Sequence, residues 1–281
     1  MPIPFVLVEN RDVGGHEYRT YSPAGDPSWM ESLAREYVDL RTACASPLND
    51  VVLEGIEIVD VEQLRRRLHQ AALPQRRGGS FDVLRSDLGE VLAYELLQQE
   101  FGMTIGYKSV RDRELPALPG RGIDAIGVEA APPTTDGRAC YRLVLAETKV
   151  SDENRSPPRV VDASEDCLRD QHLAHLSDRR ATISKIFQHA QRMTDTVARE
   201  RLLSAALMLE RDRLDRLSVV ACCVLVRSQA RCAESDSGSF EASPADYAPA
   251  NIRFLRIQLP DDVESVINAW TSVLSRTRSA A

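Results

Sequence analysis

The stretch YRLVLAETKV at residues 141–150 gives the clearest strand signal in the chain, and GIDAIGV at residues 122–128 precedes it. Both are short and apolar, as expected of buried strands. The loop between them is rich in Pro, Thr and Gly, so we predict a hairpin. Because alternate residues of a strand leave the same face, Glu147 and Lys149 continue the apolar face that carries Leu145. A charged pair in that position costs free energy unless it is paired or liganded.

A second acidic residue marks the neighbouring strand. Asp124 is the only charge in GIDAIGV. Adjacent strands would bring Asp124 close to Glu147, and two carboxylates repel each other unless a cation lies between them. A hard divalent ion with oxygen ligands fits this position, so we predict Mg²⁺, with Mn²⁺ as a substitute.

The lysine beside these carboxylates is unusual for this composition. Of the 35 basic residues, 32 are Arg, and only Lys108, Lys149 and Lys185 are Lys. Lys is more compact than Arg, and its pKa falls more readily when it is crowded. We therefore predict that Lys149 orients or helps to deprotonate an attacking water and stabilises the charge that develops on the phosphoryl group.

A long amphipathic helix predicted over residues 80–101 carries a further acidic candidate. Ser80 fits the N-cap position and Gly102 fits the stop. Glu90 has no basic residue three or four positions away, and the adjacent Gly89 permits close approach of another element. We expect Glu90 to reach the metal site as an additional ligand.

In chain order, the helical Glu90, the GID that ends at Asp124 and the ETK of residues 147–149 resemble the PD-(D/E)xK nuclease superfamily, which has the restriction-endonuclease-like fold. More narrowly, LGEVLAYELLQQEFG, then Lys108, GRGIDAIGVE and LVLAETK resemble the nuclease subunit of the Hachiman antiphage defence system. The resemblance covers about residues 84–150. One departure is an Ile, rather than a Pro, before the aspartate.

This resemblance implies a Mg²⁺-dependent endonuclease that hydrolyses DNA phosphodiester bonds as an antiphage defence effector. It implies that Asp124 and Glu147 bind the metal, that Glu90 completes or bridges the site, and that Lys149 is catalytic. The chain has no P-loop or GxGxxG motif, so we expect a helicase or ATPase partner supplied in trans. Two alternatives stay open: a non-catalytic DNA-binding or assembly subunit of a defence complex, and an RNase that uses the same site. A homodimer also stays open, since the sequence neither requires nor excludes it.

Five basic residues are candidates for contact with nucleic acid, namely Arg76, Arg77, Lys108, Arg179 and Arg180. Arg76 and Arg77 precede the Glu90 helix and are the first choice for phosphate contact. Arg179 and Arg180 follow the site in the chain and are the second choice. For each pair, and for Lys108, the alternative is a solvated structural role.

Strands and helices alternate along the chain, which predicts an α/β or α+β fold with a mixed central sheet flanked by helices. The resemblance to the PD-(D/E)xK superfamily implies that this sheet belongs to a restriction-endonuclease-like core. We divide the chain into an N-terminal α/β segment at 1–79, packed on the core, and a nuclease core at 80–281 with a helical insertion at about 162–216. Further elements are predicted as strands 3–8, 51–59, 103–110, 217–226 and 251–259, helices 29–41, 61–73 and 261–274, a turn-rich stretch 10–27 and a loop 230–250.

Composition limits the function classes. The net charge of −7 speaks against a dispersed, histone-like grip on nucleic acid, although a local basic groove remains compatible with it. No apolar run approaches the roughly 18 residues that a membrane span needs, and we identify no signal peptide. We therefore expect a cytoplasmic protein with reduced cysteines.

Cys167, His172 and His175 can suggest zinc, but no fourth ligand matches, so we favour packing and surface roles.

Overall fold

A mixed seven-stranded sheet forms the centre of the computed structural model, in the order β1-β2-β7-β6-β5-β4-β3. The pairs β2–β7, β7–β6 and β6–β5 are parallel, and the others are antiparallel. The strands are β1 Phe5–Val13, β2 His16–Pro23, β3 Thr104–Lys108, β4 Ala125–Ala131, β5 Cys140–Val150, β6 Leu217–Ser228 and β7 Asn251–Leu259. The structure describes residues 3–24, 27–42, 67, 71, 73–74, 82–113, 122–191 and 193–280. The predicted α/β class with a mixed central sheet is confirmed.

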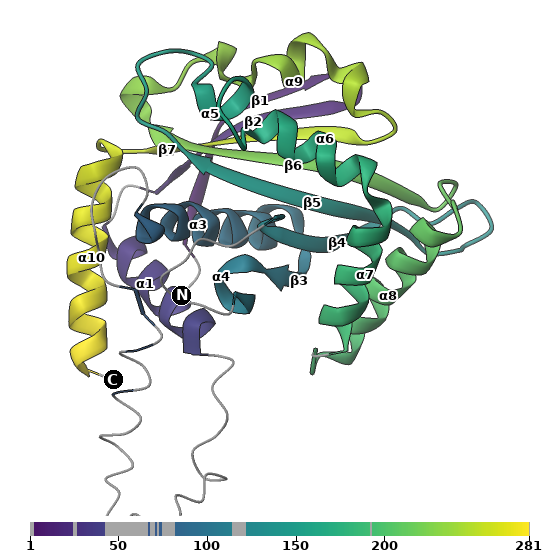
Figure 1. Ribbon diagram of the computed structural model, residues 1–281, viewed down its shortest axis with the longest axis horizontal. Coiled ribbons are helices and arrows are strands. Elements are labelled where there is room, and N and C mark those ends of the chain that lie inside the picture. The colour runs from purple at the N-terminus through teal and green to yellow at the C-terminus, as the bar shows by residue number, and fades with distance from the viewer. Residues whose placement is uncertain are drawn as a thin grey trace, which may run out of the picture.

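Helices cover both faces of this sheet (Figure 1). On one face lie α1 Ser28–Thr42, α3 Val83–Phe101 and α10 Val263–Ala280, with the short α4 Ser109–Asp112 at its edge. The other face carries α5 Arg159–Asp162, α6 Leu168–Ser177, α7 Arg179–Ala190, α8 Thr196–Glu210 and α9 Ser239–Ala242. No helix in the described ranges has the length and apolarity to cross a bilayer.

The strand β5 connects the two layers because its side chains alternate between them. Val144 and Ala146 pack in the core beneath α3, whereas Leu143 and Leu145 pack beneath α7 and α8. The hairpin predicted for this region is present, since β4 pairs antiparallel with β5. By the same alternation, Glu147 faces the α6–α7 layer.

The helix α3 lies close against β5 because of a glycine. A Cβ added at Gly89 would lie 2.5 Å from Cγ2 of Val150, so only Gly fits without a shift. Asp82 caps the helix, accepting a hydrogen bond from the Leu84 amide at 3.0 Å. At the other end, Gly102 adopts the left-handed conformation (φ 59°) that terminates the helix. The predicted stop is confirmed, and the predicted N-cap, Ser80, lies outside the described residues.

Three predictions of local structure were wrong. Part of the turn-rich stretch 10–27 is the strand β2, because Gly14 and Gly15 form a tight two-residue turn with positive φ that folds it back on β1. Residues 109–110 begin α4 rather than continuing a strand, and the loop 230–250 contains α9 and short 3₁₀ turns. The predicted elements 51–59 and 61–73 lie almost wholly outside the described residues. The division at residue 79 stays a prediction, although β2 pairs directly with β7.

Candidate metal and catalytic site

Asp124 lies at the entrance to β4, one residue before the strand begins. Its amide donates to the carbonyl oxygen of Ala146 at 3.1 Å. Its Oδ2 accepts a hydrogen bond from the Thr148 amide at 2.7 Å, and the side chain is largely buried. Asp124 therefore closes the end of the β4–β5 pairing and turns its carboxyl towards the end of β5 that carries Glu147.

Glu147 is 1% exposed and lies next to Asp124. Burial raises the pKa of Glu147 to about 8, against the opposing effect of Lys149, and a hydrogen bond joins it to Asp124. Burial and the charge of Glu147 hold the pKa of Asp124 well above its usual range. On the outer side, His175 of α6 lies with Nε2 2.7 Å from Oε1 of Glu147. Burial and mutual repulsion thus strongly disfavour two negative charges on this pair of carboxyls.

Glu90 reaches the same region from α3, on the opposite face of the sheet. Its Oε2 accepts hydrogen bonds from the hydroxyls of Tyr94 (2.9 Å) and Ser109, and its Oε1 accepts one from Ser86 (3.2 Å). The Tyr94 hydroxyl also lies 3.1 Å from the carbonyl oxygen of Asp124, which couples the two elements. Burial, followed by the charge of Asp124, raises the pKa of Glu90 well above its usual range.

We call Glu90, Asp124 and Glu147 the acidic site. Over the described residues, no Arg or Lys nitrogen lies within the 4.0 Å ion-pairing distance of these three carboxyls. Lys149 lowers the pKa of both Asp124 and Glu147, and Lys185 lowers that of Glu147, both from beyond that distance. Three buried carboxyls therefore influence one another without a bound guanidinium or ammonium group, which is costly for an isolated protein.

The acidic site suits a hard divalent cation by its chemistry, because it offers uncompensated carboxyl oxygens from separate elements. Asp124 and Glu147 are the pair that such an ion would hold. Among the residues that the structure describes, no three His, Cys, Asp or Glu side chains form a preformed metal cluster. Glu90 instead contacts hydroxyl groups, so its predicted role as a third ligand stays a prediction.

A protein-family model described as HamA matches residues 18–253, which is most of the chain. The chain belongs to the HamA family. Membership makes it a component of the Hachiman antiphage defence system, and it confirms that part of the resemblance predicted from the sequence. No curated protein and no solved structure matches the chain. The assignment to the PD-(D/E)xK superfamily stays a prediction.

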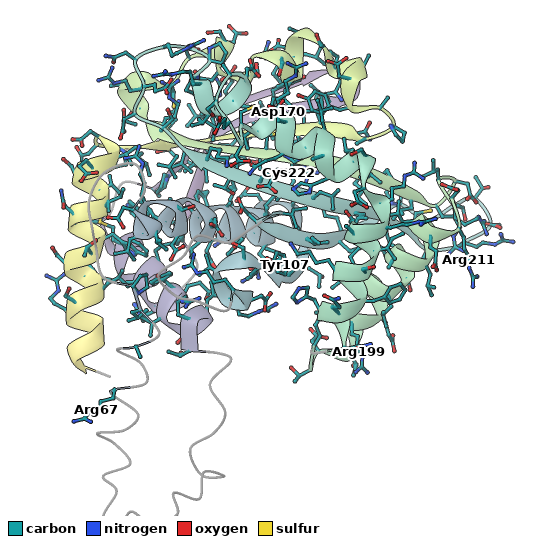
Figure 2. All side chains as sticks on the ribbon, in the orientation of Figure 1. Arg67, Tyr107, Asp170, Arg199, Arg211 and Cys222 are labelled. Atoms are coloured by element: carbon teal, nitrogen blue, oxygen red, sulfur yellow. The ribbon has the colours of Figure 1, made fainter. Side chains whose placement is uncertain are left out.

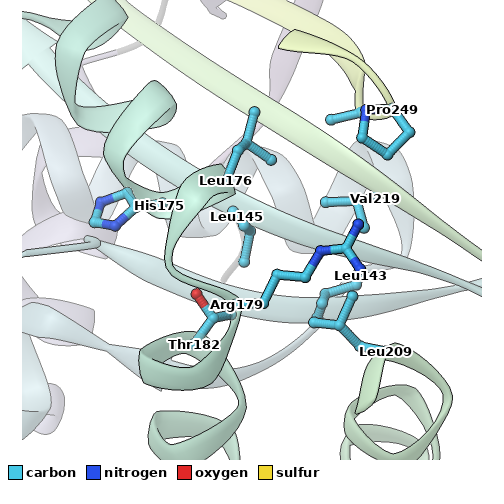
Figure 3. Close-up of a pocket in the computed structure, with 10 residues that line it drawn as sticks. Leu143, Leu145, His175, Leu176, Arg179, Thr182, Leu209, Val219 and Pro249 are labelled. Carbon is cyan, nitrogen blue, oxygen red and sulfur yellow. The ribbon is translucent and has the colours of Figure 1, made fainter. Parts of the chain in front are cut away.

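The residues predicted to contact nucleic acid differ in burial and in charge pairing. Lys108 is buried, with Nζ 3.4 Å from Oε1 of Glu36, so its charge is already paired inside the fold. Arg179 pairs with Asp212 and extends across a small apolar pocket bordered by leucines of β5 (Figure 3). Arg180 is exposed on α7. Residues 76–77 lie outside the described residues, so phosphate contact by Arg76 and Arg77 stays a prediction.

The suspected zinc pattern separates into three roles. Cys167 is buried at the N-cap of α6. His172 is fully buried and packs edge-on against Phe240, and burial lowers its pKa to about 3. Only His175 points towards the acidic site, where it contacts Glu147. Packing roles therefore account for two of the three residues, and the third touches a predicted metal ligand.

Sequence reasoning missed His175 and Lys185 as members of the site region. Both lie on the helical segment that follows β5, and only the packing of α6 and α7 over the sheet brings them to Glu147. No local spacing contains that signal. Two partners of Glu90 could have been predicted from the sequence, because Ser86 and Tyr94 are four positions away on the same helix.

Proposed function

We propose that this HamA-family chain is a metal-dependent deoxyribonuclease of the PD-(D/E)xK type. The observation that carries the proposal is the acidic site, in which three buried carboxyls from three elements lack an Arg or Lys partner in the described chain. Buried charges in proteins are paired or coordinate metals. A metal centre explains why the fold keeps these carboxyls together.

Each residue then has a role in hydrolysis of a phosphodiester bond. Asp124 and Glu147 would hold Mg²⁺ or Mn²⁺, and Glu90 would complete or bridge the site. The cation would supply stabilisation of the negative charge that develops on the phosphoryl group. Lys149 leaves the same face of β5 as Glu147, where its ammonium group can orient the attacking water and stabilise that charge. His175 would fix the orientation of Glu147 through the 2.7 Å contact.

The defence setting supports a regulated enzyme. An effector that hydrolyses DNA has to be restrained from the host chromosome in the cytoplasm. The sequence has no nucleotide-binding motif, so we propose that a helicase or ATPase subunit of the same system controls it in trans.

The direct test is cleavage of plasmid DNA and of RNA by the full chain in Mg²⁺, with and without the partner subunit. We expect DNA cleavage that EDTA abolishes and that both Asp124→Asn and Lys149→Met lose. Asp215→Asn, a change at an exposed ion pair, is the matched control and should cleave normally. Unchanged cleavage in the two site variants would refute the proposal. Absence of cleavage under every partner condition favours a non-catalytic subunit, and cleavage of RNA alone favours an RNase.

A further inference from the structure

A cleft of about 700 Å³ opens where α6 and α7 pass the start of β4. Gly122 and Ile123 line one side, and His175, Thr182, Lys185 and Gln188 line the other. His175 also contacts Glu147, so the cleft runs up to the acidic site. Lys185 is the only Lys or Arg among its lining residues.

Lys185 is held in this cleft by an aromatic ring rather than by an acid. Its Nζ lies 4.2 Å from the ring centroid of Tyr107 on β3. A Cβ built on Gly122 would lie only 3.5 Å from the same nitrogen. The ammonium group therefore lies against the backbone two residues before Asp124. A cation over an aromatic face is stabilised in place without losing its capacity to bind an anion.

The charge of Lys185 has no partner of its own in the described chain. The side chain is half-buried, and no carboxylate of a described residue lies within 4.0 Å of its nitrogen. Glu147, Asp124 and Asp112 act on its charge from beyond that distance. A half-buried ammonium group next to a cleft, without a contacting anion, is the arrangement expected of a site for an external anion.

We propose that this cleft holds one strand of nucleic acid and that Lys185 binds a backbone phosphate next to the scissile one. The inference rests on the proposed nuclease function and deepens it, because it names the residue that sets the position of the strand relative to Asp124 and Glu147. Tyr107 orients the Lys185 side chain, and the small residue at position 122 leaves the approach to its nitrogen open.

The test is binding of a labelled single-stranded DNA oligonucleotide, and of its duplex, to the full chain in Ca²⁺ over a series of salt concentrations. We expect Lys185→Met to raise Kd about tenfold at low salt, as for loss of one charge-assisted hydrogen bond. The slope of log Kd against log salt should fall by about 0.7 for the single strand or about 0.9 for the duplex, the loss of one phosphate contact. A change that only perturbs the fold would not reduce that slope by one contact.

Two further variants make the result specific. Lys185→Arg keeps the charge and should retain the slope. Arg199→Met removes a half-buried cation from the neighbouring α8, outside the cleft lining, and should also retain it (Figure 2). An unchanged slope in Lys185→Met, an equal fall in Arg199→Met, or no binding by the unsubstituted chain would overturn the proposal.

The cleavage assay in Mg²⁺ separates this inference from the function on which it rests. Salt-dependent binding through Lys185 without cleavage would support strand binding in the cleft and refute the proposed nuclease activity. Cleavage with an unaltered KM in Lys185→Met would support the nuclease activity and refute phosphate binding by Lys185 in the cleft.

Discussion

The acidic site and the arginine-paired carboxylates of the same sheet are both buried, yet only the second group is paired with guanidinium groups. Arg227 pairs with Asp236 at 2.5 Å, and all but 1% of both side chains is buried. Arg253 binds Glu129 with both terminal nitrogens. The acidic site has no comparable partner among the described residues, although the chain contains 32 arginines.

The difference separates stability from function. A buried carboxylate that only supports the fold is given a guanidinium group, because an unpaired buried charge is expensive. The acidic site instead keeps its lysines beyond ion-pairing distance, and burial raises the pKa of its carboxyls. Neutralising variants in the two regions should therefore fail in opposite ways, in activity at one and in stability at the other.

The largest effect is expected at Asp124. Asp124→Asn keeps an oxygen for the Thr148 amide but removes a charge that the metal requires. We expect kcat for DNA cleavage to fall about 10³-fold or more, the size that follows from losing several kcal/mol of charge stabilisation. Urea denaturation at pH 8 should show a metal-free variant at least as stable as the unsubstituted chain. A clear loss of stability with activity preserved would show that Asp124 supports the fold rather than catalysis.

The opposite outcome is expected at Asp236. Asp236→Asn leaves the buried Arg227 without its carboxylate. We expect the free energy of unfolding to fall by about 3–5 kcal/mol, while cleavage per folded molecule is unchanged. The measurement is denaturation in urea together with specific activity at low temperature. A variant of normal stability would show that this ion pair does not support the fold.

A smaller effect is expected at His175, which touches Glu147 from outside. We expect His175→Ala to weaken metal affinity or kcat by about 10- to 100-fold, as for other residues that orient a metal ligand. His175→Gln should recover part of the loss, since its amide can still donate to Glu147. Equal metal-binding isotherms for the alanine variant and the unsubstituted chain would leave His175 as a packing residue.

The smallest effect is a pH dependence of stability without metal. The pKa of Glu147 is raised to about 8 in the folded state, so the folded chain binds more protons than the unfolded chain above pH 4.5. Stability is therefore fully present below pH 4.5 and is lost as pH rises towards 8. We expect Glu147→Gln to remove up to about 1.4 kcal/mol per pH unit of that slope in EDTA. Identical slopes in the two proteins would show that Glu147 is not buried in a charge-disfavouring site.

Much of the fold followed from the sequence because the signals were local. The alternation in β5 and the glycine after α3 predicted a strand and a helix end that the structure contains. The β1–β2 hairpin was missed because scattered Gly and Pro obscured the tight turn at Gly14 and Gly15. The parallel order of β5, β6 and β7 depends on packing between distant segments, which no window of sequence contains.

The site was predictable to the extent that its residues belong to short patterns. Asp124, Glu147 and Lys149 are charges that interrupt apolar strands, and the fold brings the first two together. Gly89 was correctly expected to allow close approach. His175 and Lys185 come from helices that pack over β5, so their arrival at the site is a property of tertiary structure alone.

The measurement that tests the central claim most directly is anomalous diffraction from crystals of the full chain grown with Mn²⁺. The acidic site predicts a peak in contact with the carboxyl oxygens of Asp124 and Glu147, and its disappearance in Asp124→Asn crystals grown in the same way. Absence of a peak at Asp124 and Glu147, or a peak that persists in the variant, would contradict the claim that these unpaired carboxyls form a metal centre.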